Sequence, residues 1–148
     1  MAAHHYKYIV SQDHPLVMTL KHFSNDDNTQ IVVMGKQAHN KDYQLWYHKD
    51  DSYIIAMATA DNRAVTNEVT TPANGNRIFN RTKTGAQNQK WNIVPTDAGA
   101  VYITPELDNN LALTLKDGNP QEGTEVILTP ILDSGIPTGS QLWKFDHK

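Results

Sequence analysis

Every tryptophan in the chain stands two residues after a glutamine. The three triplets are Gln44-Leu45-Trp46, Gln89-Lys90-Trp91 and Gln141-Leu142-Trp143. The tryptophans lie 45 and 52 residues apart (91 − 46 and 143 − 91). A period of this length indicates an internal repeat, in which each unit buries its apolar face against its neighbours. We therefore interpret the 148 residues as one domain, 1–148, of three imperfect repeats at about residues 5–49, 50–97 and 98–148.

Each triplet follows a short segment with the alternating pattern of a β-strand. Leu16-Val17-Met18-Thr19-Leu20 closely matches Leu111-Ala112-Leu113-Thr114-Leu115, and Ala64-Val65-Thr66-Asn67 is a degraded copy in the middle repeat. Apolar residues at every second position lie on one face of a strand. Asn74-Gly75-Asn76 and Asp117-Gly118-Asn119-Pro120 are turn signals. Regularly spaced short strands without a helical period predict an all-β, barrel-like fold.

The tryptophans and the inward-facing leucines are expected to form one shared core. Burying a large apolar side chain stabilises a fold by roughly 1.5–3 kcal/mol. None of the three repeats can bury its apolar face alone, so the repeats should close around that core. This predicts a structural role for Trp46, Trp91 and Trp143 and places ligand binding in the residues around them.

Composition excludes several classes of function. The formal net charge is −3, so the chain lacks the basic surface of a nucleic-acid-binding protein. It contains no cysteine, which excludes disulfides and thiol catalysis. No segment has the length of a membrane span, and the first residues lack the apolar stretch of a signal peptide. We therefore expect no membrane insertion and a cytoplasmic location.

The three triplets at these spacings resemble the ricin B-like lectin family. The resemblance covers essentially the whole chain and is greatest for the small, cysteine-free lectins of fungi. Leu111-Ala112-Leu113-Thr114-Leu115, followed by Ser140-Gln141-Leu142-Trp143-Lys144-Phe145, is similar to their C-terminal repeat. The resemblance implies a β-trefoil of three repeats around a pseudo-threefold axis. It further implies a lectin for galactose- or N-acetylgalactosamine-type glycans and glycoproteins, with a role in defence and possible homodimer formation.

Sugar-binding repeats of this family carry three residues that this resemblance locates here. An Asp follows the first strand of the pocket, an aromatic residue stands about twelve positions before the Trp, and an Asn precedes the Gln. A carboxylate accepts from two neighbouring hydroxyls, and an aromatic ring covers the apolar face of a sugar. The position aligned with the Asp holds Thr19, Thr66 and Thr114, so none of the repeats has the carboxylate.

Only the second repeat keeps both the aromatic residue and the Asn, as Phe79 and Asn88. The glycan site implied there consists of Asn67, Phe79 and Asn88, assisted by Thr66 or Glu68. Weaker candidates in the first repeat are Thr19, Lys21 and Asn40. The threonines also fit as ordinary strand residues, and Phe79 also fits as a packing residue.

The missing aspartates leave a second function open. Fungal β-trefoils that resemble these lectins in fold include protease inhibitors of the mycocypin and cocaprin type, which block cysteine or aspartic proteases with protruding loops. The loops available for this role are His22 to Asn28, Ala73 to Arg77 and Asp133 to Gly139. Within the first, the polar run Ser24-Asn25-Asp26-Asp27-Asn28 would then be an inhibitory loop. Proteases would replace glycans as partners.

The sequence gives no case for an enzyme. It has no nucleophile elbow, phosphate-binding loop or dinucleotide fingerprint. Its histidines do not fall at metal-ligand spacings. We therefore expect no catalytic residues, no metal and no cofactor.

Overall fold

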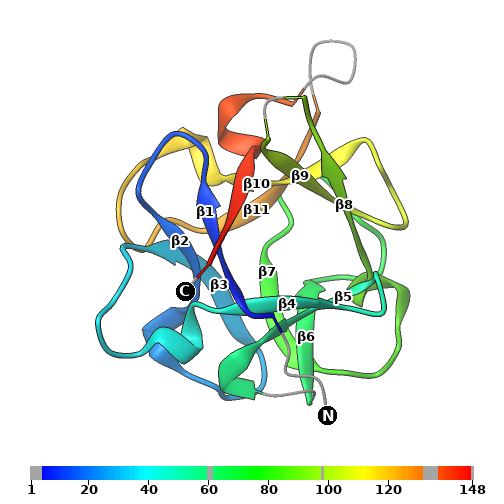
Figure 1. Ribbon diagram of the computed structural model, residues 1–148. Coiled ribbons are helices and arrows are strands. Elements are labelled where there is room, and N and C mark those ends of the chain that lie inside the picture. Colours follow the sequence, from blue (N-terminus) through cyan, green and yellow to red (C-terminus); the bar gives the residue numbers. More distant parts are fainter. Residues whose placement is uncertain (1–4, 60–61, 98, 132–136, 148) are drawn as a thin grey trace.

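The computed structural model describes residues 5–59, 62–97, 99–131 and 137–147, and each repeat contributes four strands to it (Figure 1). The first repeat has β1 (Lys7–Ser11), β2 (Val17–Leu20), β3 (Thr29–Met34) and β4 (Trp46–Lys49). The second has β5 (Tyr53–Ala56), β6 (Arg63–Asn67), β7 (Ile78–Thr82) and β8 (Trp91–Pro95). The third has β9 (Val101–Pro105), β10 (Leu111–Leu115), β11 (Val126–Pro130) and β12 (Trp143–His147).

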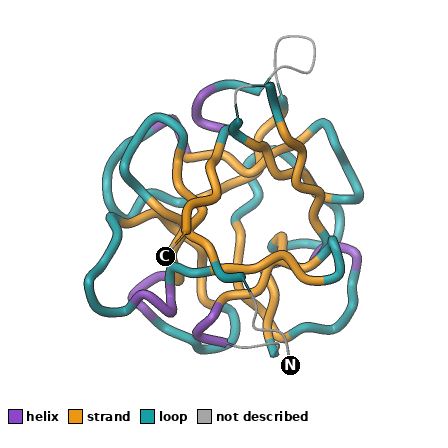
Figure 2. Tube along the Cα trace, in the orientation of Figure 1, coloured by secondary structure: helices purple, strands orange, loops and turns teal. Residues whose placement is uncertain are grey.

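Short 3₁₀ helices lie between many of these strands. They are η1 (Lys21–Phe23), η2 (Lys41–Tyr43), η3 (Met57–Thr59), η4 (Gln87–Gln89), η5 (Lys116–Gly118) and η6 (Gly139–Gln141). The tube view shows loops outside and strands around a common centre (Figure 2). The all-β prediction is confirmed for the described residues. In that same part of the chain, no helix is long and apolar enough to cross a membrane.

The first and last strands of each repeat form a barrel, and the middle two form a hairpin. Antiparallel pairs β1–β12, β1–β4, β4–β5, β8–β9 and β9–β12 build the barrel. The backbone N–H of Trp91 donates to the carbonyl of Ser52 over 2.8 Å and links β8 to β5. Hairpins β2–β3, β6–β7 and β10–β11 close one end. This arrangement is a β-trefoil.

The strand registers show which positions of the three repeats are equivalent. Trp46, Trp91 and Trp143 lie opposite Ala56, Pro105 and Ser11. In the hairpins, Leu20, Asn67 and Leu115 lie opposite Ile31, Ile78 and Val126. A residue in one repeat can therefore be compared with its two counterparts by position in the sheet.

One apolar core joins the three repeats, as the sequence predicts. The three tryptophans are all buried in it, together with the alternating residues Leu16, Met18, Leu20, Leu111, Leu113 and Leu115. Each indole N–H donates to a backbone carbonyl of the preceding hairpin, those of Met18, Val65 and Leu113, over 3.1, 2.9 and 3.1 Å. A buried indole needs such an acceptor, so the tryptophans fix the hairpins to the barrel.

Candidate functional site

The glutamine of each triplet holds its repeat together beneath the surface. Gln89 donates through Nε2 to the hydroxyl of Thr66 over 3.2 Å and to the carbonyl of Thr82 over 2.9 Å. Its Oε1 accepts from the backbone N–H of Thr84 over 2.9 Å. The equivalent glutamine–threonine pairs are Gln44–Thr19 at 3.2 Å and Gln141–Thr114 at 3.5 Å. The threonines that align with the family's aspartate are therefore partners of the triplet.

This placement corrects the expectation that Thr19 and Thr66 contact a sugar. Thr19 is 0% exposed and Thr66 is 2% exposed. Each hydroxyl accepts from its glutamine and donates to the carbonyl two residues earlier, that of Val17 over 2.9 Å and that of Ala64 over 2.8 Å. A hydroxyl has one donor hydrogen. Both threonines are thus satisfied inside the fold and have no surface for a ligand.

Asn67 and Asn88 are brought together at the end of β6. Asn67 is 1% exposed, and its Nδ2 donates to the carbonyl of Val69 and to Oδ1 of Asn76, both over 3.0 Å. Asn88 is half-buried, and its Nδ2 donates to the backbone carbonyl of Asn67 over 3.0 Å. Oδ1 of Asn88 has no hydrogen bond within the described residues and can accept from a ligand. Asn67 therefore positions the site, and Asn88 presents an acceptor.

Phe79 lies on β7 directly opposite Thr66 of β6 and Gln30 of β3. Its ring is half-buried. The guanidinium carbon of Arg81 lies 4.9 Å from the ring centroid, and that of Arg77 lies 5.6 Å away. Both guanidiniums are therefore within cation–π distance of the ring. Phe79 is thus a partly exposed ring fixed in place beside β6.

Glu68 connects this ring to the end of β6. Its carboxylate accepts the backbone N–H of Arg77 and lies 3.5 Å from the Arg77 guanidinium. Its backbone carbonyl accepts from Nη1 of Arg81 over 2.9 Å. The two arginines and Glu68 therefore form one linked charged group next to Phe79, and the Glu68 side chain is partly exposed.

Three equivalent positions meet where the hairpins close, and they carry different charges. Gln30, Arg77 and Glu125 each stand one residue before an equivalent strand position, namely Ile31, Ile78 and Val126. Nε2 of Gln30 donates to Glu125 over 2.5 Å. Burial acts to raise the pKa of Glu125, but hydrogen bonds from Gln30 and Lys116 outweigh it and hold that pKa below its ordinary value. Glu125 therefore stays ionised close to Arg77.

The first-repeat candidates do not form a comparable group. Thr19 is buried, Lys21 is exposed at the start of η1, and Asn40 is exposed in a left-handed conformation before η2. A cavity of about 270 Å³ is lined by Lys21 together with Phe23, Met34 and Glu122, without Asn40. Lys21 and Asn40 thus remain separate surface residues.

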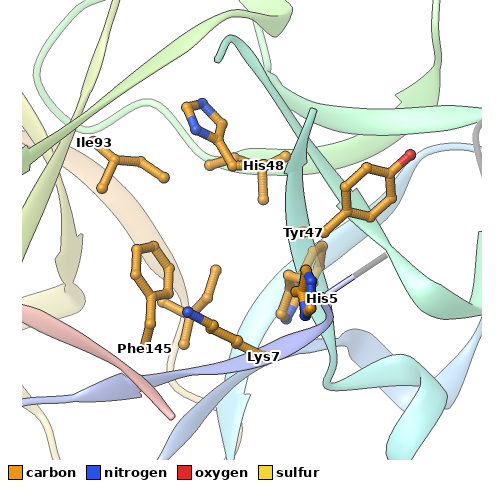
Figure 3. A pocket seen from close by; sticks show the side chains of 9 residues that line it. His5, Lys7, Tyr47, His48, Ile93 and Phe145 are labelled. Carbon is orange, nitrogen blue, oxygen red and sulfur yellow. The ribbon is translucent and has the colours of Figure 1, made fainter. Parts of the chain in front are cut away.

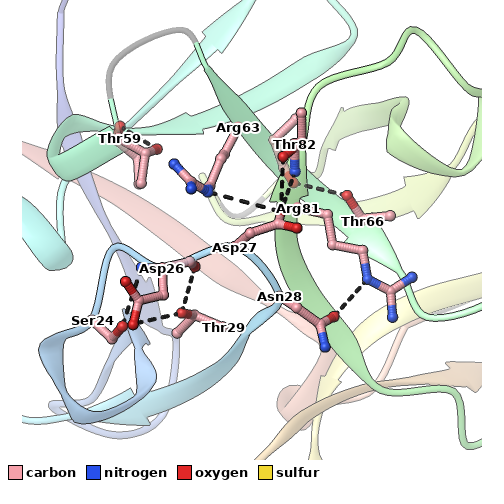
Figure 4. A network of polar contacts seen from close by, with 12 residues as sticks. Ser24, Asp26, Asp27, Asn28, Thr29, Thr59, Arg63, Thr66, Arg81 and Thr82 are labelled. Atoms are coloured by element: carbon pink, nitrogen blue, oxygen red, sulfur yellow. Dashed lines mark hydrogen bonds and ion pairs between the residues drawn. The ribbon is translucent and has the colours of Figure 1, made fainter.

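The proposed inhibitory loop, residues 24–28, is docked on the second repeat (Figure 4). Oδ1 of Asp27 accepts from the backbone N–H of Thr82 over 2.6 Å and from its hydroxyl over 3.0 Å. Oδ1 of Asn28 accepts from Nε of Arg81 over 2.8 Å. Ser24 accepts from the backbone N–H of Asp26 over 3.1 Å. Only Asn25 and Asp26 keep side chains without a hydrogen bond inside the described residues.

Four residues of the second-repeat site are not among the residues that the sequence predicts. Arg77 and Arg81 flank Phe79 at two residues on either side and so share its face of β7. That period of two was visible in the sequence. Asn76 and the exposed Val69 were not detectable, because they reach Asn67 and Asn88 through a loop whose path only the structure shows.

The chain belongs to a known family. Residues 40–129 match the family model described as ricin-type β-trefoil lectin domain-like. This span is more than half of the chain and includes the whole second repeat, so the chain is a member of that family. No curated protein sequence matches the chain significantly.

Solved structures of low sequence identity share the fold. The designed threefold-symmetric protein ThreeFoil is 17% identical with a TM-score of 0.84, over 97% of this chain and 99% of that chain. The ricin B-like lectin of Macrolepiota procera, solved with lactose, is 20% identical with a TM-score of 0.75, over 100% and 99%. The C-half of the earthworm R-type lectin, solved with GalNAc, is 12% identical with a TM-score of 0.74, over 97% and 98%.

The described residues also bear on metal binding. Within ranges 5–59, 62–97, 99–131 and 137–147, no group of three or more histidine, aspartate or glutamate side chains is placed to hold a metal ion.

Proposed function

We propose that this chain is a non-enzymatic, carbohydrate-binding lectin that takes galactose- or N-acetylgalactosamine-type glycans at its second repeat. One observation carries the proposal. The half-buried ring of Phe79 and the free amide oxygen of Asn88 are fixed to adjacent residues of β6, since Phe79 lies opposite Thr66 and Asn88 is bonded to Asn67. An aromatic face and a hydrogen-bond acceptor that are tied to neighbouring residues of one strand suit a sugar ring with its hydroxyls.

Each residue of the site has a role in this proposal. Phe79 stacks on the apolar face of the sugar, and Oδ1 of Asn88 accepts from a sugar hydroxyl. Glu68 supplies a partly exposed carboxylate that can accept a second hydroxyl, and hydrogen bonds to charged groups contribute about 1.5–3 kcal/mol. Asn67 positions Asn88 through its backbone carbonyl. Thr66 accepts a hydrogen bond from the side chain of Gln89 and so fixes its position beneath the site.

The N-acetyl form of the sugar is favoured by one apolar neighbour. Val69 is 46% exposed, and its carbonyl accepts from both Asn67 and Asn88. An exposed valine at the edge of a polar site offers a contact for the methyl group of an acetamido substituent. A single shallow site binds weakly, so we propose that a homodimer provides the avidity for multivalent glycoproteins.

Affinity chromatography and a glycan array test the proposal. The wild-type protein is expected to bind immobilised galactose or N-acetylgalactosamine and to be eluted by the free sugar. Phe79→Ala and Asn88→Ala are each expected to lower binding at least about tenfold, because each removes one contact. Ser140→Ala, the counterpart of Asn88→Ala in the third repeat, should bind as wild type. An array without any bound glycan would overturn the proposal.

The same binding step serves the role in defence that we propose for the chain. A defence lectin acts by binding glycans of the attacking organism, so toxicity and glycan binding should be lost together. A feeding assay with wild type and Phe79→Ala tests this. Equal toxicity of the two proteins would separate defence from the second-repeat site.

Protease inhibition through loop 24–28 is a second candidate function. Its support is the fixed conformation of the loop, since preorganisation lowers the entropic cost of binding. Asn25 and Asp26 would enter the cleft of the protease, because Asp27 and Asn28 are engaged with Thr82 and Arg81. Full activity of papain and pepsin in the presence of excess protein would remove this candidate.

A further inference from the structure

The barrel contains an apolar cavity at the end where β1 begins and β4 ends. Its volume is about 290 Å³. The apolar part of its wall includes Ile9, Ile54, Ile93 and Phe145. Figure 3 shows Ile93 and Phe145 along one side of the opening. Lys7 lies next to Phe145, and His48 lies on the side of the opening opposite Lys7. None of the glycan-site residues lines this cavity.

The strand register explains why the wall is apolar. In the barrel, Ile9 pairs with Phe145, Ile54 with His48 and Ile103 with Ile93. These three pairs are equivalent under the pseudo-threefold symmetry of the fold. One member of each pair, Phe145, His48 or Ile93, stands two residues after the tryptophan of a Gln-x-Trp triplet. Two of the three repeats place a large apolar side chain at this level, and only the first repeat places a histidine there.

The first repeat also adds a lysine and two histidines to the rim. Lys7 occupies the position equivalent to Ser52 and Val101, and it lies opposite Trp46 in the neighbouring strand. His5 lines the cavity as well. Among the described residues, the lining thus contains one lysine and two histidines and no acidic residue. Within the described residues, the side chains of Lys7 and His5 make no hydrogen bond or ion pair.

His48 is oriented by the barrel itself. Its Nε2 lies 3.3 Å from the backbone carbonyl of Trp91 and therefore donates to it. Nδ1 of the same ring is left without a protein partner in the described part of the chain. The rim consequently offers the ammonium of Lys7 as its donor to an anion above an apolar interior.

We propose that this cavity binds a medium-chain aliphatic carboxylate, with its tail among Ile9, Ile54, Ile93 and Phe145 and its carboxylate at the ammonium of Lys7. A volume of about 290 Å³ would hold about ten water molecules at roughly 30 Å³ each, close to the number of non-hydrogen atoms in octanoate. Ligand pockets begin at about 300 Å³. The single sign of the rim charge selects an anion, and a charge beside an apolar wall is weakly screened.

A ligand series with the wild-type protein tests this inference without any change to the fold. Titration calorimetry with octanoate, octanol and octylamine compares three head groups on one tail. Octanoate is expected to bind at least about tenfold more tightly than octanol, because a charge-assisted hydrogen bond is lost with the alcohol, and octylamine more weakly still. Equal binding of octanoate and octanol would overturn the proposal. Failure of octanoate to bind would also overturn the proposal. This includes the outcome in which a second copy of the chain covers the cavity and excludes the ligand.

Variants that carry the residue found at the equivalent position of another repeat test where the ligand binds. Ile93→Phe copies Phe145 and fills the cavity, so it should abolish octanoate binding. Lys7→Val copies Val101 and should weaken octanoate about tenfold while leaving octanol unchanged. Phe79→Ala lies in the glycan site and should bind octanoate as wild type. Wild-type affinity in Ile93→Phe would place the ligand elsewhere and contradict the inference, whatever the outcome of the glycan assays.

Discussion

Nε2 of Gln89 donates to the hydroxyl of Thr66 over 3.2 Å, and this buried pair recurs in each repeat as Gln44–Thr19 and Gln141–Thr114. The hydroxyl stands where the family's sugar-binding repeats carry a carboxylate. In this chain the glutamine and the threonine therefore satisfy each other within the fold. The sugar binding that we propose therefore rests on residues farther out, chiefly Phe79 and Asn88.

The first prediction concerns the strength of this pair. Thr66→Val keeps the shape of the side chain but leaves the amide of Gln89 with one fewer buried acceptor. We expect the free energy of unfolding to fall by about 1–3 kcal/mol, the cost of a buried unsatisfied donor. Urea unfolding measures this loss. Thr71→Val, at an exposed position, should change stability by less than about 0.5 kcal/mol.

A second prediction rests on a polar residue within the core. Asn80 is fully buried where the other repeats have Val33 and Leu128, and neither of its amide atoms has a partner in the described part of the chain. Asn80→Val should therefore stabilise the protein by about 1–3 kcal/mol. The reverse change, Val33→Asn, should destabilise it. A lower urea midpoint for Asn80→Val would show that the amide of Asn80 is satisfied in solution.

The third prediction is a pH dependence at loop 24–28. The backbone N–H of Thr82, its hydroxyl and Arg63 together lower the pKa of Asp27 below its ordinary value of 3.8, against a smaller opposing effect of burial. A lowered folded-state pKa adds stability above the unfolded value, and that stability is lost as the pH falls through the folded pKa. The effect is at most about 1 kcal/mol, because the Asp27 side chain is 55% exposed.

Urea unfolding of Asp27→Ala at about pH 7 and about pH 3 checks this dependence. The variant should be less stable than wild type at the higher pH, and the difference should shrink at the lower pH. Asp26→Ala removes a neighbouring carboxylate without a hydrogen bond in the described residues, and it should follow wild type at both pH values. An equal deficit of Asp27→Ala at both pH values would contradict the assigned role of the charge.

The fold was predictable because the sequence repeats its core. The spacing of the tryptophans and the alternation of Leu111, Leu113 and Leu115 identified the buried face before any register was known. The role of Thr66 was not predictable in the same way. Threonine suits both buried and exposed strand positions, and the choice depends on whether a partner such as Gln89 reaches it.

The candidate site was predictable only in part. The positions of Phe79 and Asn88 followed from the resemblance, and the register of β6 with β7 joins them to adjacent residues. The linked charged group of Arg77, Arg81 and Glu68 depends on side chains crossing between strands, which the sequence pattern does not reveal. The barrel cavity likewise needs the pairing of Ile54 with His48 to be recognised.

The central claim is that the second repeat binds the sugar. Titration of the ¹⁵N-labelled protein with lactose and with N-acetylgalactosamine, followed by amide chemical shifts, tests it most directly. The predicted result is a saturable shift of signals from residues 67–69, 76–81 and 88, which is absent in Phe79→Ala. Saturable shifts confined to the first or third repeat, or no shifts with either sugar, would contradict the claim.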